Sequence, residues 1–238
     1  MKFLMILITL LLSMNSFAWD MSDQDYRAIW GEYWEKGTLN LLLQHLDNGM
    51  NPSSRAYAYD DKGKLLGSSP LLFGVVRGLD SIYEIEQLND KERLQNESRL
   101  KAFYKLIEKG ANVNDYDTDT FSPAAPSVLM QAAENVRPDI VKILLEKGAN
   151  PKYSYSFGAS TYTPMYFAIK SFCEECLLLL ENKGVSILDD NCEAYHKFYW
   201  RNGKCGEDIW LKTIREFVER SAPEIFLKCG DDKTNPCK

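Results

Sequence analysis

The chain has 238 residues, with 28 basic and 34 acidic side chains, which gives a formal net charge of −6 at pH 7. Hydrophobic residues make up 45% of it, enough for a substantial core at this length. A mildly acidic chain is not drawn to nucleic acid or to anionic membranes by charge, so neither is expected as a partner. A basic protein surface suits it better.

The first 18 residues have the features of a secretory signal peptide. Lys2 supplies a positive charge, residues 3–12 are apolar, and Ser16-Phe17-Ala18 has the small-x-small pattern of a cleavage site. An uncleaved membrane anchor is the alternative, but the apolar run is shorter than the about 20 residues that a span needs. Trp19 follows the cut where a lipoprotein would have cysteine. We therefore expect a periplasmic or secreted chain without membrane insertion, and loss of Lys2 changes its net charge from −6 to −7.

Four segments of the chain end in the same way, with an apolar run followed by a glycine turn. Residues 106–112 and 144–150 are nearly identical, and weaker copies lie at 46–51 and 180–186. Self-similarity at a spacing of a few tens of residues is typical of stacked repeat proteins, because one unit cannot bury its apolar face alone. Each unit should contain a helix, a tight turn, a second helix that ends at glycine, and an extended loop.

The third unit shows this pattern best. Ser127 can cap a first helix, and Pro138 suits the first turn of a second helix, where its missing N–H is not needed. The second helix has an apolar face over residues 140–145. Gly148 is expected to take the left-handed conformation that ends this helix, because it has no side chain to resist it.

These residues resemble the ankyrin repeat, which opens with T-P-L-H-x-A and closes with V-x-x-L-L-x-x-G-A-x-x-N. Residues 69–72, 127–130 and 163–166 match the opening, and 141–150 match the close. The family histidine is absent from every copy, so packing must replace its hydrogen bonds. The resemblance extends over residues 22–187. It implies an all-α fold, an ankyrin-like solenoid of about four helix-turn-helix repeats, with a repeat domain over 19–187.

Two regions depart from the repeat pattern. Gly49 and Gly110 lie 61 residues apart, whereas the family repeat is about 33 residues long. The second unit therefore carries an insertion near 79–99, which we expect to lengthen the second helix or add a helical turn; a mobile lid is the alternative. Residues 188–238, with an amphipathic helix over 207–219, are expected to form a C-terminal helical cap with disulfides.

All six cysteines lie in the last third of the chain. An even number in an exported protein favours disulfides, and sequence alone does not select the pairing. Short loops favour a bond between Cys229 and Cys237, and next a bond between Cys192 and Cys205. Cys173 and Cys176 have the spacing of a redox or zinc motif. Because they lie where a helix begins, with no second such pair nearby, a structural staple is favoured.

Motifs for catalysis are not found. His45 and His196 are surrounded by apolar or aromatic residues, and the patterns of serine hydrolases, zinc peptidases and nucleotide-binding loops are missing. Residues 115–119 resemble the start of a calcium loop but lack its glycine and its bidentate glutamate. We expect no enzyme activity, no cofactor and no metal.

The predicted loops are rich in tyrosine and aspartate. Tyrosine provides a large contact area at a low entropy cost, and carboxylates steer a basic partner. The alternative, which we assign to about half of the loop aromatics, is packing of one long loop against the next. The residues expected to bind a protein partner are Tyr57, Tyr59, Asp115, Tyr116, Asp117, Asp119, Tyr153 and Tyr155.

The resemblance implies a module that binds another protein through its loops and first helices. Combined with export, this favours an immunity or inhibitor protein that neutralises a toxin or an enzyme by direct binding. A periplasmic assembly or protective factor for an exported enzyme is the first alternative. A thiol-disulfide oxidoreductase that uses Cys173 and Cys176 is a more distant one.

Overall fold

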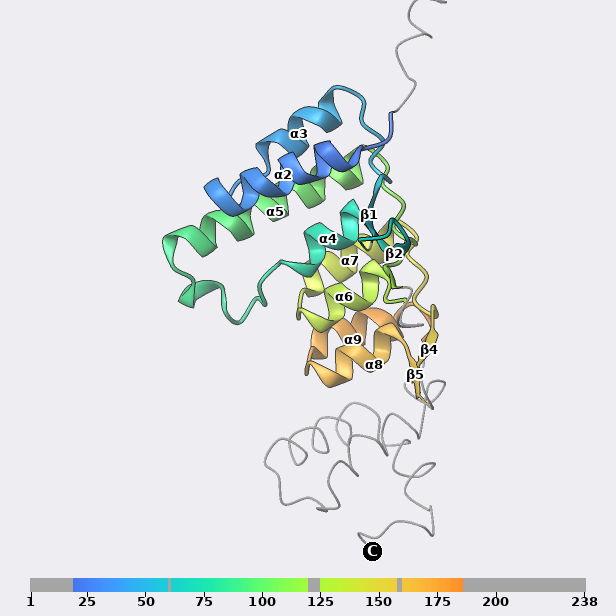
Figure 1. The fold of residues 1–238 in the computed structure, drawn as a ribbon. Coiled ribbons are helices and arrows are strands. Elements are labelled where there is room, and N and C mark those ends of the chain that lie inside the picture. The colour runs from blue at the N-terminus through green and yellow to red at the C-terminus, as the bar shows by residue number, and fades with distance from the viewer. Residues whose placement is uncertain (1–18, 60, 120–124, 158–159, 186–238) are drawn as a thin grey trace, which may run out of the picture. The chain divides into compact units, whose positions relative to one another are not determined.

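The computed structural model describes residues 19–59, 61–119, 125–157 and 160–185, which are coloured in Figure 1. Their contacts divide the chain into two compact units. The first unit is formed by Met1–Leu79 with Gln87–Asn112, and the second by Asp80–Glu86 with Val113–Lys238. In the described ranges, no helix combines the length and the apolar character of a membrane span.

The first unit opens with two antiparallel helices, α2 (Asp23–Lys36) and α3 (Asn40–Asp47). Ser22 caps α2 by accepting the N–H of Asp25, whose side chain binds back to Ser22, so the helix begins with a capping box. Ile29 of α2 and Leu42 and Leu46 of α3 are buried between the helices, as the apolar spacing predicts.

A β-hairpin and two more helices complete this unit. Strands β1 (Arg55–Tyr59) and β2 (Leu65–Pro70) pair antiparallel, and β2 leads directly into α4 (Leu71–Arg77). A short 3-10 turn, η1 (Ile85–Gln87), precedes α5 (Asp90–Glu108). Helix α5 has 19 residues, and its first ten, together with η1, lie within the range 79–99 where an insertion is predicted.

Arg99 of α5 fastens three helices of the first unit together. Its side chain is only 5% exposed. Its Nε donates to the Tyr33 hydroxyl at 2.7 Å, and Nη1 donates to the Gly74 carbonyl at 2.7 Å, one of the unpaired carbonyls at the end of α4. The guanidinium also lies 4.3 Å from the Tyr33 ring centroid, a cation–π contact. Gly78 leaves room for this group, because a Cβ there would overlap the guanidinium carbon.

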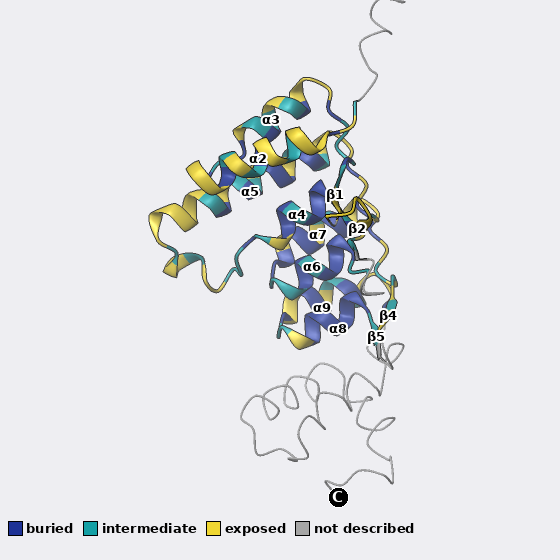
Figure 2. Cartoon of the chain, in the orientation of Figure 1, coloured by how far each residue is buried: buried dark blue, intermediate teal, exposed yellow. Residues whose placement is uncertain are grey.

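The second unit contains two helix pairs. Strand β3 (Thr118–Asp119) precedes α6 (Val128–Glu134) and α7 (Pro138–Glu146), and the hairpin of β4 (Tyr155–Phe157) and β5 (Ser160–Tyr162) precedes α8 (Pro164–Lys170) and α9 (Glu174–Glu181). Helix α8 packs on α6 and α9, and α9 also packs on α7. Figure 2 shows that each of these four helices carries buried residues. Alanines at 132, 133 and 168 are fully buried, which allows the helices to approach closely.

The second helices all end in the same way. Gly49, Gly110, Gly148 and Gly184 have φ angles of 91°, 86°, 87° and 75°. After α7, the N–H of Ala149 donates to Leu144 and that of Gly148 donates to Leu145, the hydrogen-bond pattern of a Schellman motif. The prediction that Gly148 ends its helix in the left-handed conformation is confirmed, as are the Ser127 cap and the position of Pro138.

The prediction of an all-α fold was wrong in one respect. The fold is mostly helical, but two of the expected extended loops are β-hairpins, β1–β2 and β4–β5. Aromatic residues alternate with small ones in β1 and β4, and this period of two suits a pleated strand. The predicted signal peptide and the predicted cap over 188–238 lie outside the described residues.

Candidate functional site

The β4–β5 hairpin of the second unit carries a cluster of aromatic rings. Tyr155 and Tyr162 are cross-strand partners, and their rings stack at 5.1 Å with an interplanar angle of 16°. From α8, the ring of Tyr166 meets Tyr162 edge-on at 4.9 Å, and Phe167 lies 6.2 Å from it. Side chains of directly opposed strand residues point to the same face, so this face of the hairpin rests on α8.

A second aromatic pair joins the loop before α6 to the loop after α7. The rings of Tyr116 and Tyr153 stack at 5.8 Å with an angle of 20°. The Tyr153 hydroxyl donates to the carbonyl of Ala125 at 2.8 Å. Tyr116 is held by a β-bridge to Ser127, yet 40% of its surface stays exposed. The pair is therefore fixed on one side and open to solvent on the other.

Two of these tyrosines, Tyr153 and Tyr155, have raised pKa values. Burial raises the pKa of Tyr155 to about 12, with smaller contributions from Tyr162 and from the carboxylate of Glu134. Burial also raises the pKa of Tyr153, and Tyr116 adds to the effect. A neutral phenol can both donate and accept a hydrogen bond, so this surface offers aromatic faces and hydroxyl groups without its own tyrosinate charge.

Carboxylates flank the exposed ring of Tyr116. Asp115 accepts the N–H of Tyr116 at 2.9 Å, and the N–H of Asp117 donates to Pro126 at 3.0 Å. Both aspartates are half-buried. The side chain of Asp119 lies outside the described residues. The structure therefore brings Asp115, Tyr116, Asp117 and Tyr153 together, as the sequence suggested for one loop surface.

The first unit presents its hairpin tyrosines differently. Tyr57 and Tyr59 are two residues apart on β1, so they share one face of the hairpin. They are 47% and 51% exposed, and neither stacks on another aromatic ring in the described part of the chain. Both side chains are exposed on the hairpin, as a binding role requires. Within the described residues, no neighbouring ring holds theirs in one orientation.

Sequence reasoning missed four residues at the edge of the aromatic cluster. Tyr166 and Phe167 of α8 contribute two of its rings. The Lys170 ammonium binds Glu134 of α6 at 2.6 Å and lies 5.4 Å from the Phe167 ring centroid. Their positions in the sequence could have indicated them, because all four residues lie on α6 or α8, the first helices that directly follow the loops.

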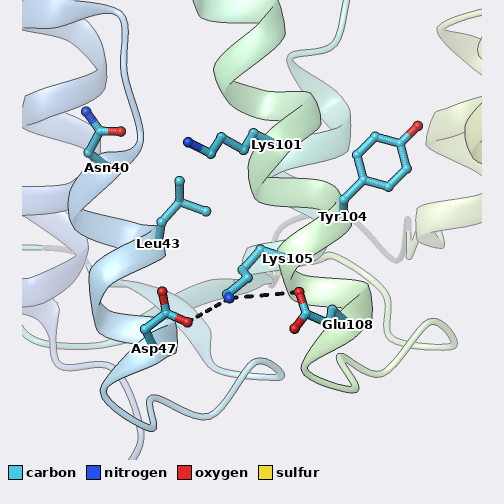
Figure 3. A pocket seen from close by; sticks show the side chains of 7 residues that line it. All are labelled: Asn40, Leu43, Asp47, Lys101, Tyr104, Lys105 and Glu108. Atoms are coloured by element: carbon cyan, nitrogen blue, oxygen red, sulfur yellow. Dashed lines mark ion pairs between the residues drawn. The ribbon is translucent and has the colours of Figure 1, made fainter.

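A separate pocket lies between α3 and α5, with a volume of about 510 Å³. Figure 3 shows its lining, with Lys105 between Asp47 at 2.7 Å and Glu108 at 3.8 Å. The Lys105 ammonium lowers the pKa of Asp47, and Asp47 in turn raises the pKa of Lys105. Because its charges largely neutralise each other, the pocket offers no strong electrostatic preference. Its lining residues are Asn40, Leu43, Asp47, Lys101, Tyr104, Lys105 and Glu108.

The residues considered for chemistry serve structural roles. Cys173 and Cys176 form a disulfide at the start of α9, and their residues are 1% and 0% exposed. The Cys173 sulfur also accepts the N–H of Cys176, so the pair caps the helix, as predicted for a staple. His45 lies 3.9 Å from Asp25 and contacts the Trp19 ring. Within the described ranges, no three metal-binding side chains come together. The other four cysteines and His196 lie outside these ranges.

Residues 94–191 match the family model described as ankyrin repeats (3 copies). The match begins within α5 and continues through α6 to α9, so the resemblance is confirmed for this part of the chain. Ankyrin repeats are protein–protein interaction modules, and their stacking builds extended binding surfaces. No curated protein matches the chain.

Proposed function

We propose that the chain is an exported ankyrin-type protein that neutralises another protein, a toxin or an enzyme, by binding it directly. The observation that carries this proposal is the stacked pair of Tyr116 and Tyr153, fixed on one side and exposed on the other. Ring pairs held in this way lose little conformational freedom on binding, so more of their contact energy appears as affinity.

The chemistry of this surface supports a basic partner. Asp115 and Asp117 precede and follow Tyr116 in the chain, and the whole chain has a net charge of −6. A positive surface would be steered toward it, and the partner's arginines could stack on the tyrosine faces. An inhibitor needs such a surface and no catalytic group of its own, which suits the residues found here.

The proposal includes four repeats, formed by α2–α3, α4–α5, α6–α7 and α8–α9. Support for counting α2–α3 comes from its ending, since Gly49 closes α3 with the same hydrogen bonds and positive φ as Gly148 closes α7. Residues 188–238 would cap the last repeat, because solenoid proteins need a polar terminal element for solubility. Signal peptide cleavage and a periplasmic location belong to the same proposal.

Capture from a periplasmic extract tests the function. The chain from Trp19 to Lys238 would be immobilised, and retained proteins identified by mass spectrometry and then bound to the purified variants. Tyr116→Ala should weaken the captured interaction by about tenfold or more, because a few aromatic residues carry most interfaces. Tyr104→Ala is the matched control, because Tyr104 is 50% exposed but lies on α5.

The activity of the captured partner decides between the functions. Loss of its activity upon titration with the chain supports an inhibitor. Unchanged activity with improved folding or lifetime supports an assembly factor instead. If Tyr104→Ala weakens binding and Tyr116→Ala does not, the surface proposed here is wrong.

A further inference from the structure

A recurring pair of hydrogen bonds fastens the loop that follows a second helix. In the second unit, Asn114 donates its side-chain N–H to Gly148 at 3.0 Å and accepts the N–H of Asn150 at 2.7 Å. One side-chain amide thus bridges two backbone groups of the next repeat. Asn114 lies four residues after Gly110, the glycine that ends its own repeat.

The first unit uses the same position. Ser53 lies four residues after Gly49 and accepts the N–H of Asn112 at 2.9 Å. Asn112 and Asn150 are equivalent, each lying two residues after its glycine. The loops after α5 and α7 are therefore both held by a side chain from the preceding repeat.

In the loop after α3, the equivalent backbone groups are bound by Trp19. Its backbone N–H donates to Gly49 at 3.2 Å, and its carbonyl accepts the N–H of Asn51 at 2.7 Å. Gly49 and Asn51 correspond to Gly148 and Asn150. The backbone of Trp19 thus makes two hydrogen bonds to the first repeat. They are equivalent to the two that the side-chain amide of Asn114 makes to the third repeat, α6–α7.

Side-chain contacts also hold Trp19 in this position. Its indole N–H donates to Asn48 at 3.4 Å, and its ring meets the His45 ring edge-on at 5.3 Å. Next to it, Asn51 donates to the Asp20 carboxylate at 2.7 Å. Asn48 and Gly49 follow the last residue of α3, so their carbonyls lie at the negative end of the helix dipole. A positive charge is stabilised there.

We propose that proteolysis between Ala18 and Trp19 makes Trp19 the first residue of the chain, and that its new α-ammonium binds Gly49 as the N-terminal cap of the repeats. The small-x-small sequence 16–18 ends at the same bond. A signal peptidase of the exporting cell would hydrolyse this bond. One water is consumed, the C–N bond breaks, the carboxylate stays on Ala18 and the ammonium forms on Trp19.

Cleavage would strengthen the hydrogen bond that the backbone nitrogen of Trp19 donates to Gly49. The amide N–H of Trp19 becomes part of a cation at the end of α3, and hydrogen bonds from charged donors are about twice as strong as neutral ones. The inference rests on the signal peptide cleavage of the proposed function and adds the role of the new amino terminus, and its tests involve no partner.

The cleavage position is tested with the full chain, expressed from Met1 in an export-competent bacterium. The intact mass of the purified protein should correspond to residues 19–238. A product that retains residues 1–18, or that begins elsewhere, overturns the proposal.

The cap is tested by comparing chains of residues 19–238 with a free and with an acetylated amino terminus at pH 6. Acetylation keeps the N–H but removes the charge, so the melting midpoint should fall by about 2–4 °C. The control is the same pair of chains at pH 10, where the free α-amino group is neutral and the two chains should melt alike. Equal midpoints at pH 6 overturn the role of the ammonium, even if cleavage occurs at Trp19.

Discussion

Both hairpins carry tyrosines but differ in how these are held. Tyr57 and Tyr59 of β1 are about half exposed and stack on no other ring within the described residues, whereas Tyr155 of β4 stacks on Tyr162, which contacts Tyr166 of α8. The difference originates in the helices behind them. Helix α4 begins with leucines 71 and 72, which are buried, whereas α8 places aromatic rings at its start. A tyrosine on a loop is thus a packing residue or a free contact surface depending on the helix that follows it.

The two units also differ in how they hold a buried arginine. The first unit buries the guanidinium of Arg99 against aromatic rings and carbonyl groups. The second unit buries Arg137, whose guanidinium is paired with the Asp139 carboxylate, and its core also contains aliphatic and small side chains such as Leu129, Ala132 and Leu144. We therefore compare a cavity among these aliphatic side chains with the loss of the polar contacts around Arg99.

The largest effect is expected for Leu144→Ala in the second unit. Leu144 is fully buried, so its truncation should destabilise by about 2–5 kcal/mol through lost burial and a residual cavity. Urea unfolding followed by circular dichroism measures this. Ile143→Ala is a nearby comparison at a position that is only half-buried, and its cost should be clearly smaller. Equal costs would contradict the assignment of Leu144 to the core.

A polar interior in the first unit predicts a strong effect of one added methyl group. Gly78→Ala should push the Arg99 guanidinium from its place and leave the Tyr33 hydroxyl and the Gly74 carbonyl unpaired, at a cost of about 2–3 kcal/mol. Gly31→Ala is the matched control, because a Cβ there meets nothing within 4 Å, and it should be neutral or slightly stabilising. Similar results for both would mean that Arg99 does not bear on stability.

A smaller effect is expected at the glycine that ends α7. Gly148 has a φ of 87° and open space around its Cα, so Gly148→Val should cost about 1–2 kcal/mol from backbone strain alone. Gly148→Asn should cost less, because asparagine tolerates this conformation. The melting midpoints of the two variants provide the measurement, and an unchanged midpoint for valine would refute the strain argument.

The smallest effects distinguish the two hairpins. Tyr155→Ala removes a stacked ring and should cost about 1 kcal/mol or more. Tyr57→Ala should stay within about 0.5 kcal/mol of the parent, as for other exposed substitutions. Thermal unfolding of both variants tests this difference. If both variants lose the same free energy of unfolding, Tyr57 contributes to stability as much as Tyr155 does, and the difference between the two hairpins proposed here is wrong.

The pH dependence sharpens this distinction. The pKa of Tyr155 is raised from its usual 10 to about 12 in the folded state, so folding favours the neutral phenol. Its contribution to stability is complete below pH 10 and is lost as the pH rises toward 12. Unfolding midpoints measured between pH 9 and 12 should fall less steeply in Tyr155→Phe, which has no hydroxyl to ionise.

Local signals in the sequence predicted most helix ends. Ser127, Pro138 and Gly148 act within one turn of the chain, so their roles can be inferred without the rest of the fold. The burial of Arg99 could not be predicted in this way, because its partners come from α2 and α4, far away in sequence. The same reason separates Tyr155 from Tyr57, since each ring's environment depends on a helix that packs behind it.

For the candidate surface, the sequence indicated loops rich in tyrosine and aspartate, and their role in binding a partner stays a prediction. It did not indicate that α8 supplies Tyr166 and Phe167 to the aromatic cluster of the β4–β5 hairpin. The Thr163-Pro164 opening places residues 165–167 in the first turn of that helix, but which face meets the hairpin depends on the strand register. Register is a property of the paired strands and not of either one alone.

The bonds made by Ser53 and Asn114 have a consequence for where the chain tolerates extra length. The four-residue step from Gly49 to Ser53 equals that from Gly110 to Asn114, and one added residue in either step would move the bridging side chain away from its partner. Residues 61–64 at the tip between β1 and β2 are exposed, and longer surface loops cost little entropy. An epitope peptide or a fluorescent-protein graft placed between β1 and β2 should therefore leave the repeats folded, whereas the same graft after Gly110 should not.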